Sequence, residues 1–498
     1  MSIKKLAGQT VWYGASSIAA RFLNYLLTPY LTGVLAVSGY GEMSLVYAAI
    51  PFLNVIFTYG IETAYFRFSH KEGFKKDIYS TSSISIFIST ILLTALLLIY
   101  HTTVAHWLRL DDHPEFITYS ALIIALDALA TLPFARLRQE GRPRKFAMIR
   151  VTSIIVTIAL TIFFISVCPR IVAGHPAGLI AKYYRANYGV GYVILANLIG
   201  SFITLVLLSR ELFAFQWKFN TAVWKQIMIY SLPLIIAGFG GMINETFDRI
   251  MLGWWAPVHS VEAAKNEVAI YSGCYKLSIL ISLFIQAFRM GAEPFFFKQS
   301  EGTNPQRTYA RVMKFFVITI SVMFLVVALY LNIWKYFLTR KTYWTGLKVV
   351  PILLLANMFL GIYYNLSIWY KLTHKTISGA YITLIGAVIT LVINYFFIPY
   401  YSYMACAWAT FFCYGSMMVI SYAWGQKTYR IPYAWKKLCA YMIIAVILYF
   451  IHGTVLHFFH SRVVDLSVAT FLLLQYLWFL TLVERQEFKK LPVVGKFF

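Results

Sequence analysis

The sequence contains few charged residues for its length. Only 12% of the 498 residues are Asp, Glu, Lys or Arg, whereas a soluble globular domain carries about 25%. Hydrophobic residues make up 60% of the chain, and the mean hydropathy is +0.68. Because too little polar surface is available to cover a water-exposed exterior, the composition excludes a water-soluble multidomain protein.

Acidic residues are especially scarce. There are 19 Asp and Glu residues against 43 Lys and Arg residues, which gives a formal net charge of +24. On a soluble protein such an excess would indicate nucleic-acid binding. In an apolar chain the meaning of the charge depends on where the basic residues lie relative to the apolar runs. Their positions, described below, account for the excess by membrane orientation, so no nucleic-acid partner is expected.

Motifs for metal binding and covalent catalysis are also missing. The five cysteines form no CxxC pair and the ten histidines form no HExxH motif, so no metal and no cofactor are expected. The longest stretch between apolar runs, residues 168–187, is too short for a soluble catalytic domain. The acidic group Asp111, Asp112 and Glu115 lies in a short loop and is interpreted as solvent-exposed. The sequence therefore predicts no catalytic residue and disfavours an enzyme.

Long apolar runs dominate the chain. A helix needs about 20 mostly apolar residues to cross a hydrocarbon core of about 30 Å. About fourteen runs meet this length. They cover residues 9–35, 40–66, 79–104, 116–135, 146–167, 188–209, 227–253, 269–292, 311–332, 349–370, 377–397, 404–425, 437–458 and 464–483. The runs are continuous rather than alternating, which excludes an outer-membrane barrel and predicts an all-α polytopic membrane protein.

The distribution of basic residues predicts how the helices are oriented. An even number of spans puts both termini on one side, and the segments on that side hold 28 of the 43 basic residues, against ten in the opposite loops. The other five lie within or at the edges of runs. Because cytoplasmic loops carry the excess of Lys and Arg, we expect both termini in the cytoplasm. The side that carries the termini is called the basic side below.

A weak internal repeat indicates how the spans are grouped. The stretch YGIETAYFRFS at 59–69 aligns without gaps on MGAEPFFFKQS at 290–300, so that Glu62 matches Glu293. Repeated halves are common in membrane transporters, although the matches are few and chance similarity is the alternative. We predict a six-helix lobe at 1–222, a second six-helix lobe at 223–425, and two extra helices with a C-terminal tail at 426–498.

Polar residues inside the apolar runs are the candidates for function, because a charge in hydrocarbon is costly and normally faces a cavity or a partner. Run 227–253 is the richest. Asn244, Glu245, Asp248 and Arg249 follow one another at helical spacing and share one face. Two interpretations stand side by side. Either the stripe lines a translocation path, or Glu245 and Arg249 pair within the helix and only neutralise each other.

Further candidates lie in the first, second, fourth and eighth runs. The groups suited to an anionic substrate head in a central cavity are Arg21, Asn24, Asn244, Arg249 and Lys276. The acidic candidates for ion coupling or gating are Glu62, Asp127, Glu245, Asp248 and Glu293. For Asp127 we expect a coupling ion or a salt bridge, whereas Glu293 and nearby Arg289 can also extend to the membrane surface. A cavity charged on one side and apolar elsewhere suits an amphiphile with an anionic head and a lipid tail.

A family resemblance is carried by four stretches. They are LAGQTVWYGASSIAARFLNYLLTPYLTGVL (6–35), GYGEMSLVYAAIPFLNVIFTYGIETAYFRF (39–68), YSLPLIIAGFGGMINETFDRIMLGWW (230–255) and AIYSGCYKLSILISLFIQAFRMGAEPFFFK (269–298). Together they resemble the polysaccharide-transporter family, the flippases of lipid-linked oligosaccharides. This family belongs to the multidrug/oligosaccharidyl-lipid/polysaccharide exporter superfamily.

The resemblance implies two six-helix lobes in a V, alternating access between the two membrane faces, and two extra helices beside the cleft. It implies a protein of the bacterial inner membrane that moves a polyprenyl-pyrophosphate-linked oligosaccharide from the cytoplasmic to the outer leaflet. The product would enter O-antigen, capsule or exopolysaccharide synthesis. The implied partners are membrane lipids, a proton or cation gradient, a polysaccharide polymerase and a chain-length regulator.

Other functions remain as alternatives. Lipid II flippases typically carry a charged pair in their first helix, whereas Arg21 is followed by Phe22, so the likeness to them is weaker. The likeness to cation-coupled multidrug exporters is weaker still. A membrane-embedded glycan polymerase or acyltransferase is a candidate of another class, and the missing outer loops argue against it.

Overall fold

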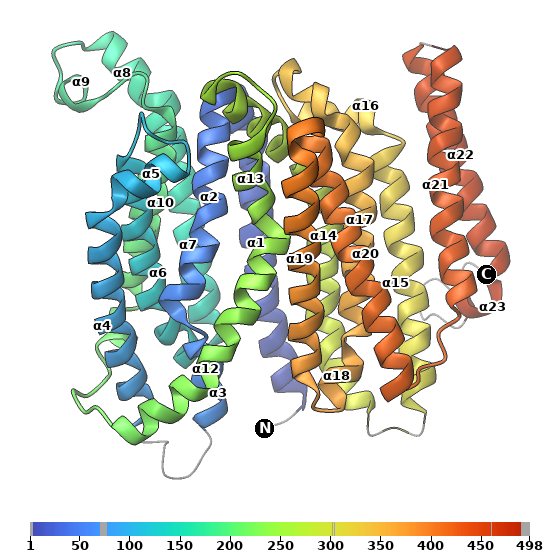
Figure 1. Ribbon diagram of the computed structural model, residues 1–498, viewed down its shortest axis with the longest axis horizontal. Coiled ribbons are helices and arrows are strands. Elements are labelled where there is room, and N and C mark those ends of the chain that lie inside the picture. Colours follow the sequence, from blue (N-terminus) through green and yellow to red (C-terminus); the bar gives the residue numbers. More distant parts are fainter. Residues whose placement is uncertain (1–2, 70–76, 301, 303, 460, 490–498) are drawn as a thin grey trace. The chain divides into compact units, whose positions relative to one another are not determined.

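A computed structural model describes residues 3–69, 77–300, 302, 304–459 and 461–489 (Figure 1). All regular structure within these residues is helical. Among these residues, side chains are described from Ile18 onward, with the exception of Phe488. Some of the basic residues used in the orientation argument lie outside the described residues, namely Lys71, Lys75, Lys76, Lys490 and Lys496.

The helices follow one another along the chain with short connections. Those of the first half are α1 (Ile3–Val34), α2 (Val37–Thr58), α3 (Ile61–Phe68), α4 (Ile78–Ile99), α5 (His101–Trp107), α6 (Glu115–Gln139), α7 (Pro143–Ile162), η1 (Phe163–Val167), α8 (Cys168–Gly174), α9 (Leu179–Tyr183), α10 (Gly189–Leu207), α11 (Ser209–Leu212), α12 (Thr221–Met242), η2 (Ile243–Phe247) and α13 (Asp248–Trp255). Those of the second half are α14 (Val261–Gln299), α15 (Pro305–Ala328), α16 (Leu331–Trp334), η3 (Lys335–Phe337), η4 (Lys341–Val349), α17 (Val350–Leu366), α18 (Ile368–Leu372), α19 (Thr376–Tyr401), α20 (Tyr403–Thr428), α21 (Trp435–Phe458), α22 (Arg462–Val483) and α23 (Arg485–Phe488).

The expected membrane spans are confirmed. Within the described residues, 13 helical stretches are long and apolar enough to cross a membrane. They coincide, in order, with the runs predicted from 40–66 onward. The remaining predicted run, 9–35, falls within α1, a continuous helix of 32 residues. The fold class is therefore an all-α, multi-pass membrane protein, as the apolar runs predicted.

By their contacts the residues form two compact units. Unit 1 comprises 1–273, 340–343 and 383–413, and unit 2 comprises 274–339, 344–382 and 414–498. The helices α14, α19 and α20 contribute residues to both. This grouping follows contacts and not motion, so the predicted lobes at 1–222 and 223–425 stay a prediction.

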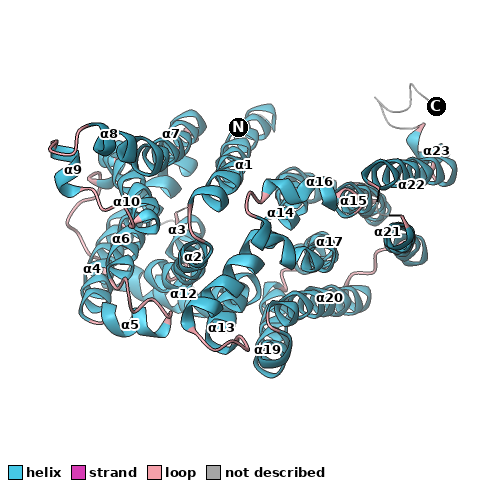
Figure 2. Ribbon diagram, turned by 90° about the horizontal axis from the view of Figure 1, so that it is seen from above, coloured by secondary structure: helices cyan, strands magenta, loops and turns pink. Residues whose placement is uncertain are grey.

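Unit 1 is organised around α6. This helix packs against α2, α4 and α10, and α1 packs along α7 (Figure 2, viewed from above). Small residues on α6, among them Ala128 and Ala135, are fully buried and let neighbouring helices approach closely. Large apolar side chains such as Phe57 and Ile61 fill the space around them. This core positions α3 and α6, which carry the candidates Glu62 and Asp127.

Unit 2 is organised around α15, which packs against α17, α21 and α22. At one end of the unit a buried cluster joins α14, α15 and α18 through Phe296, Tyr309 and Ile368. The hydroxyl of Tyr309 donates to the backbone carbonyl of Phe296 at 2.8 Å. The last two long helices, α21 and α22, pack against each other as a pair.

A sharp break separates α2 from α3. Tyr59 and Gly60 both adopt left-handed backbone conformations, with φ of 36° and 70°. A side chain added at Gly60 would approach Leu234 at 3.1 Å. The break therefore needs a residue without Cβ, and it places Glu62 in the first turn of α3.

We predict that Gly60→Ala lowers stability whereas Gly241→Ala does not. The first change adds a Cβ to a left-handed residue, which costs about 1–2 kcal/mol, and crowds Leu234. The second lies inside α12, where an added Cβ meets nothing within 4 Å and Ala is favoured over Gly by about 1 kcal/mol. Apparent melting temperatures of the detergent-purified variants test this. A wild-type melting temperature for Gly60→Ala would show that the break tolerates a side chain.

Candidate functional site

The most strongly constrained charge in unit 1 is Asp248, the first residue of α13. It is 3% exposed. The hydroxyl of Tyr271 donates to its Oδ2 at 2.6 Å, and the backbone N–H of Arg249 donates to its Oδ1 at 2.8 Å. The guanidinium of Arg249 completes an ion pair at 3.1 Å. We call Asp248, Arg249, Tyr271 and Cys406 the Asp248 cluster, because the Cys406 thiol donates to the Asp248 carbonyl at 3.7 Å.

The local backbone explains how these groups meet. Residues Ile243–Phe247 form a π-helical turn, η2, between α12 and α13. Such turns insert an extra residue into a helix and recur at functional sites. The guanidinium of Arg249 donates to the carbonyl of Glu245 at 2.9 Å, while the Glu245 side chain itself is exposed. The neutralising pair that the sequence placed between Glu245 and Arg249 is thus formed by Arg249 with its neighbour Asp248.

The side chain of Asn244, expected to contact substrate, contacts the backbone of a neighbouring helix. It is 7% exposed, and its amide donates to the backbone carbonyl of Thr383 on α19 at 3.0 Å. The side chain therefore ties the π-helical turn to α19. A role of Asn244 in holding substrate stays a prediction.

The two substrate-binding candidates on α1, one cationic and one neutral, are accessible. Arg21 and Asn24 are both exposed, and they lie two and one turns before Pro29, which is inside the helix. A residue that contacts substrate must be accessible. A charged side chain within a membrane span is costly unless it faces a cavity or a partner, so an exposed Arg21 is consistent with a substrate contact.

Two acidic candidates connect helices within unit 1. Glu62 of α3 forms an ion pair with Arg138 of α6. Asp127 of α6 accepts a hydrogen bond from Ser201 of α10 at 2.9 Å, and the Arg150 guanidinium interacts with it electrostatically. In the structure each contact joins two helices, α3 to α6 and α6 to α10. An ion-coupling role for Glu62 or Asp127 stays a prediction.

The remaining candidates lie in unit 2. Glu293 of α14 forms ion pairs with Arg289 at 3.0 Å and with Lys371 at 2.6 Å. Arg289 also lies over the ring of Tyr364, 4.5 Å from its centre. Glu293 thus links α14 to α18. Lys276 is half-buried in α14.

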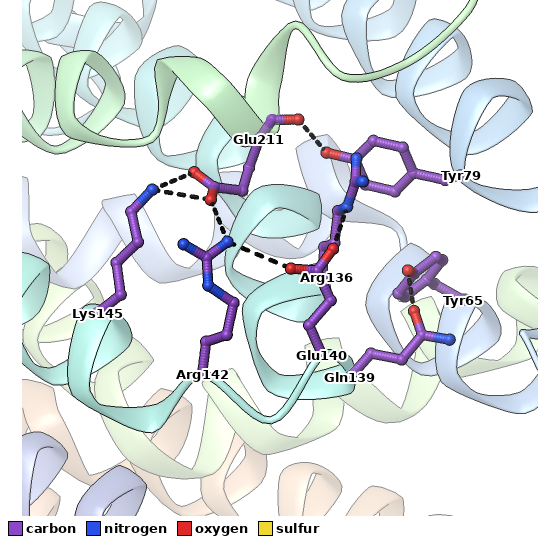
Figure 3. A network of polar contacts seen from close by, with 8 residues as sticks. All are labelled: Tyr65, Tyr79, Arg136, Gln139, Glu140, Arg142, Lys145 and Glu211. Carbon is purple, nitrogen blue, oxygen red and sulfur yellow. Dashed lines mark hydrogen bonds and ion pairs between the residues drawn. The ribbon is translucent and has the colours of Figure 1, made fainter.

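A polar network on the basic side of unit 1 was not foreseen (Figure 3). Glu211 is 2% exposed and accepts hydrogen bonds from Lys145 at 2.7 and 2.8 Å and from Arg142 at 2.9 Å. Burial opposes ionisation of nearby Glu140, but hydrogen bonds from Arg136 and Arg142 outweigh it and lower the pKa of Glu140. The signal in the sequence that could have pointed to this network is that Glu211 is the only acidic residue between Glu140 and Glu245.

A second unforeseen contact lies on the opposite side of unit 1. Lys265, at the start of α14, is 4% exposed and binds Glu42 of α2 at 2.8 Å. Exposed Asp112 lies 3.5 Å away from the same ammonium group. A Cβ added at Gly41 would come within 2.0 Å of the Lys265 carbonyl, so the two backbones touch. We call Glu42 and Lys265 the Glu42–Lys265 clasp.

Comparison with known sequences adds family information. Residues 6–300 match the model of a family described as polysaccharide biosynthesis protein. A protein of the Lsg locus of Haemophilus influenzae is 20% identical over 303 residues, which are 59% of this chain and 66% of that protein. The chain thus spans just under two thirds of that relative. A membrane protein of the same organism is 23% identical over 387 residues, 76% of this chain and 87% of its own length.

Comparison with solved structures identifies the fold. The lipid II flippase MurJ, in an inward closed conformation, gives a TM-score of 0.73 at 14% identity and covers 96% of this chain and 99% of its own. A multidrug resistance MATE family transporter of the MOP superfamily, in an inward-facing conformation, gives 0.63 at 13% identity over 85% of this chain and 95% of its own. An outward-facing multidrug resistance MATE family transporter gives a TM-score of 0.59 at 13% identity, over 88% of this chain and 96% of its own.

We predict that Asp248 and Tyr271 are energetically coupled. Tyr271→Phe removes a donor from a buried carboxylate, and hydrogen bonds to charged groups contribute about 1.5–3 kcal/mol. Asp248→Asn removes the charge that this donor serves, so the two changes together should cost less than their sum. A double-mutant cycle on the free energy of unfolding in detergent measures the coupling. Additive effects would mean that the two side chains act independently.

Proposed function

The chain belongs to the polysaccharide biosynthesis protein family and has the fold of MOP-superfamily transporters and flippases, and from this premise we propose that it flips a lipid-linked glycan. The proposed substrate is a polyprenyl-pyrophosphate-linked oligosaccharide. It would move from the cytoplasmic to the outer leaflet of a bacterial inner membrane for surface polysaccharide synthesis.

The observation that carries the proposal is the Asp248 cluster. A charged residue inside a membrane span is costly and marks a substrate or ion pathway. Arg249 lies in the helical stretch Thr221–Trp255, most of which is not buried. A guanidinium presents a planar fork that matches phosphate oxygens. In the structure Asp248 neutralises this cation, and a pyrophosphate would compete with the carboxylate for it.

Arg21 and Asn24 on α1 extend the same argument. Both are exposed, and the arginine offers a second cation for an anionic head. Lys276 of α14 belongs to unit 2, and a contact of this residue with an anionic head group stays a prediction. Coupling to a proton or cation gradient is assigned to the acids already named, foremost Asp248, because its protonation would release Arg249 from the ion pair.

The proposed topology follows from the charge distribution. With 28 of 43 basic residues on the side of the termini, we assign that side, including the Glu211 network, to the cytoplasm. The Glu42–Lys265 clasp then lies on the outer side. The partners assigned to the substrate's later steps are a polysaccharide polymerase and a chain-length regulator.

Two contacts close the outer side of unit 1 in this assignment. Lys265 binds Glu42, and the Arg340 guanidinium donates to the carbonyl of Gly33 at 3.2 and 3.3 Å. Each joins a residue before position 222 to one after it, that is, residues of the two predicted lobes. Alternating access would require both contacts to break when the outer side opens.

A second candidate is export of lipid II itself. The likeness to the lipid II flippase MurJ extends over 96% of this chain and favours this candidate over a multidrug exporter. The two are separated by the phenotype of a deletion strain: loss of a surface glycan supports the first, and cell lysis supports the second.

We predict that purified protein in vesicles moves a labelled polyprenyl-pyrophosphate glycan between leaflets and that the arginines set the rate. Arg21→Ala and Arg249→Ala should each lower the rate at least tenfold, on the order of one lost charge-assisted contact. Arg249→Lys should retain more activity, because the charge remains.

The matched control for the arginine variants is Arg430→Ala, an exposed arginine after α20, which should transport at the wild-type rate. Failure of the wild-type protein to move the cognate glycan would reject the proposed function. Full transport in both Arg21→Ala and Arg249→Ala would reject the assigned binding site alone.

We predict that the clasp controls access from outside. Glu42→Gln leaves the buried Lys265 ammonium without its nearest carboxylate, which weakens the closed state. A cysteine introduced by Asn24→Cys should then react faster with an impermeant maleimide added to cells. The exchange Glu42→Lys with Lys265→Glu should restore the slow rate.

Asp112→Asn is the control for this test, because Asp112 is 79% exposed and 3.5 Å from Lys265 and should leave labelling unchanged. An exchange variant that labels as fast as Glu42→Gln would argue against an electrostatic clasp.

A further inference from the structure

The connection between α7 and α10 is longer than a loop between two spans requires. The stretch Pro143–Gly174 is helical over 32 residues, and at 1.5 Å per residue it is ~48 Å long. A bilayer core is about 30 Å thick. The last turns of this stretch, in and around α8, therefore extend beyond the hydrocarbon.

The residues that follow α9 contact the first turn of α10, which is the next membrane span. After α9, the ring of Tyr184 stacks on Tyr192 with 5.0 Å between centres and an interplanar angle of 2°. The N–H of Arg185 donates to the Tyr192 hydroxyl at 2.7 Å. Tyr192 lies in the first turn of α10, itself a span. These contacts hold α9 beside the end of a span, at the end of unit 1 that also carries α5 (Figure 1).

The side chains of α9 do not suit water. Leu179 is 82% exposed, more than any other large hydrophobic residue described, and Tyr183 is 75% exposed. They are four residues apart and share one face of the helix. Apolar pairs of this kind at the end of a span are buried when they enter the headgroup region of a bilayer.

The charges around this face are of one sign. Arg170, Lys182 and Arg185 are exposed, and the sequence contains no Asp or Glu between Glu140 and Glu211. At the neighbouring connection between α5 and α6, Asp111 and Glu115, the first residue of α6, are paired with histidines at 2.7 and 3.2 Å. The third acid there, Asp112, lies 3.5 Å from the Lys265 ammonium group. The surface is therefore complementary to anions.

We propose that residues 168–187, which contain α8 and α9, form an interfacial anchor that binds the phosphate headgroups of anionic phospholipids. Leu179 and Tyr183 insert at the level of the upper acyl chains, while Lys182 and Arg185 contact phosphates beside them. Cations near a charged bilayer each contribute to such binding. The leaflet is the outer one if the proposed topology holds, and lipid binding itself does not depend on the proposed function.

The anchor is connected to the helix that carries Arg21. The hydroxyls of Tyr30 on α1 and Ser166 in η1 are 2.5 Å apart, and α1 packs along α7. Headgroups bound at α9 would therefore fix the outer end of α7 against the bilayer and support α1 from one side.

The test places an environment-sensitive fluorophore on Tyr183→Cys in the full-length protein. Nanodiscs contain either phosphatidylcholine alone or phosphatidylcholine with phosphatidylglycerol. We expect a blue-shifted emission in both lipids, and a further, salt-sensitive shift with phosphatidylglycerol. The same fluorophore on His259→Cys, an exposed residue of the loop between α13 and α14, should report water in both lipids.

Two further variants separate the contributions. Lys182→Gln with Arg185→Gln should reduce the phosphatidylglycerol-dependent part roughly tenfold and leave the shift in neutral lipid. Leu179→Ser should remove most of the shift in both. Because all these residues are exposed, the variants should fold, which gel filtration checks.

Two results would overturn the proposal. Emission from position 183 equal to that from position 259 in both lipids would place the segment in water, open to a protein partner. A shift that is the same in both lipids and unchanged by Lys182→Gln with Arg185→Gln would leave an apolar anchor without headgroup binding. Labelling of His259→Cys in whole cells tests the topology separately, so that failure of the leaflet assignment and failure of lipid binding can be told apart.

Discussion

The cost of placing charge in hydrocarbon is the constraint on which this structure depends. A chain that is 60% hydrophobic and 12% charged cannot leave buried charges without partners. Asp248 is buried and receives three hydrogen bonds from Arg249 and Tyr271. Lys265 and Glu211, the other strongly buried ions of unit 1, are paired in the same way. The Lys265 and Glu211 pairs join elements distant in sequence, and Tyr271 joins α14 to Asp248 of α13, so these buried charges also hold helices to one another.

The spans could be read from the sequence because they depend on one property. A hydrocarbon core of about 30 Å selects apolar runs of a given length, whatever lies beside them, and the helices follow the predicted runs closely. The partners of the charges could not be read in this way. Helical spacing of four residues suggested Glu245 with Arg249 as one of two interpretations, but the Arg249 guanidinium pairs with the carboxylate of Asp248 and donates to the backbone carbonyl of Glu245. Glu245 lies in the π-helical turn Ile243–Phe247, and a turn of this kind has no clear sequence signal.

Contacts between segments distant in the sequence were even harder to predict from the sequence. Lys265 was counted with a loop, because its position before an apolar run says nothing about Glu42, 223 residues away. Glu211 carried no signal in the sequence that pointed to its partners Arg142 and Lys145. For the candidates Asn244 and Asp127 the partners, a backbone carbonyl of α19 and a serine of α10, follow from packing that only the folded chain defines.

The basic residues on the side opposite the termini gain meaning from this comparison. Orientation by charge needs an excess on one side, and 28 of 43 basic residues supply it. Basic residues on the opposite side reduce the charge asymmetry that orients the protein. Their presence therefore needs an explanation other than orientation. Lys265 and Arg340 are held by specific acceptors, the Glu42 carboxylate and the Gly33 carbonyl. Lys182 and Arg185 instead remain exposed next to an apolar pair. Among these cations, Lys265 and Arg340 hold helices together, whereas the exposed Lys182 and Arg185 are the ones that we propose to bind phospholipid headgroups.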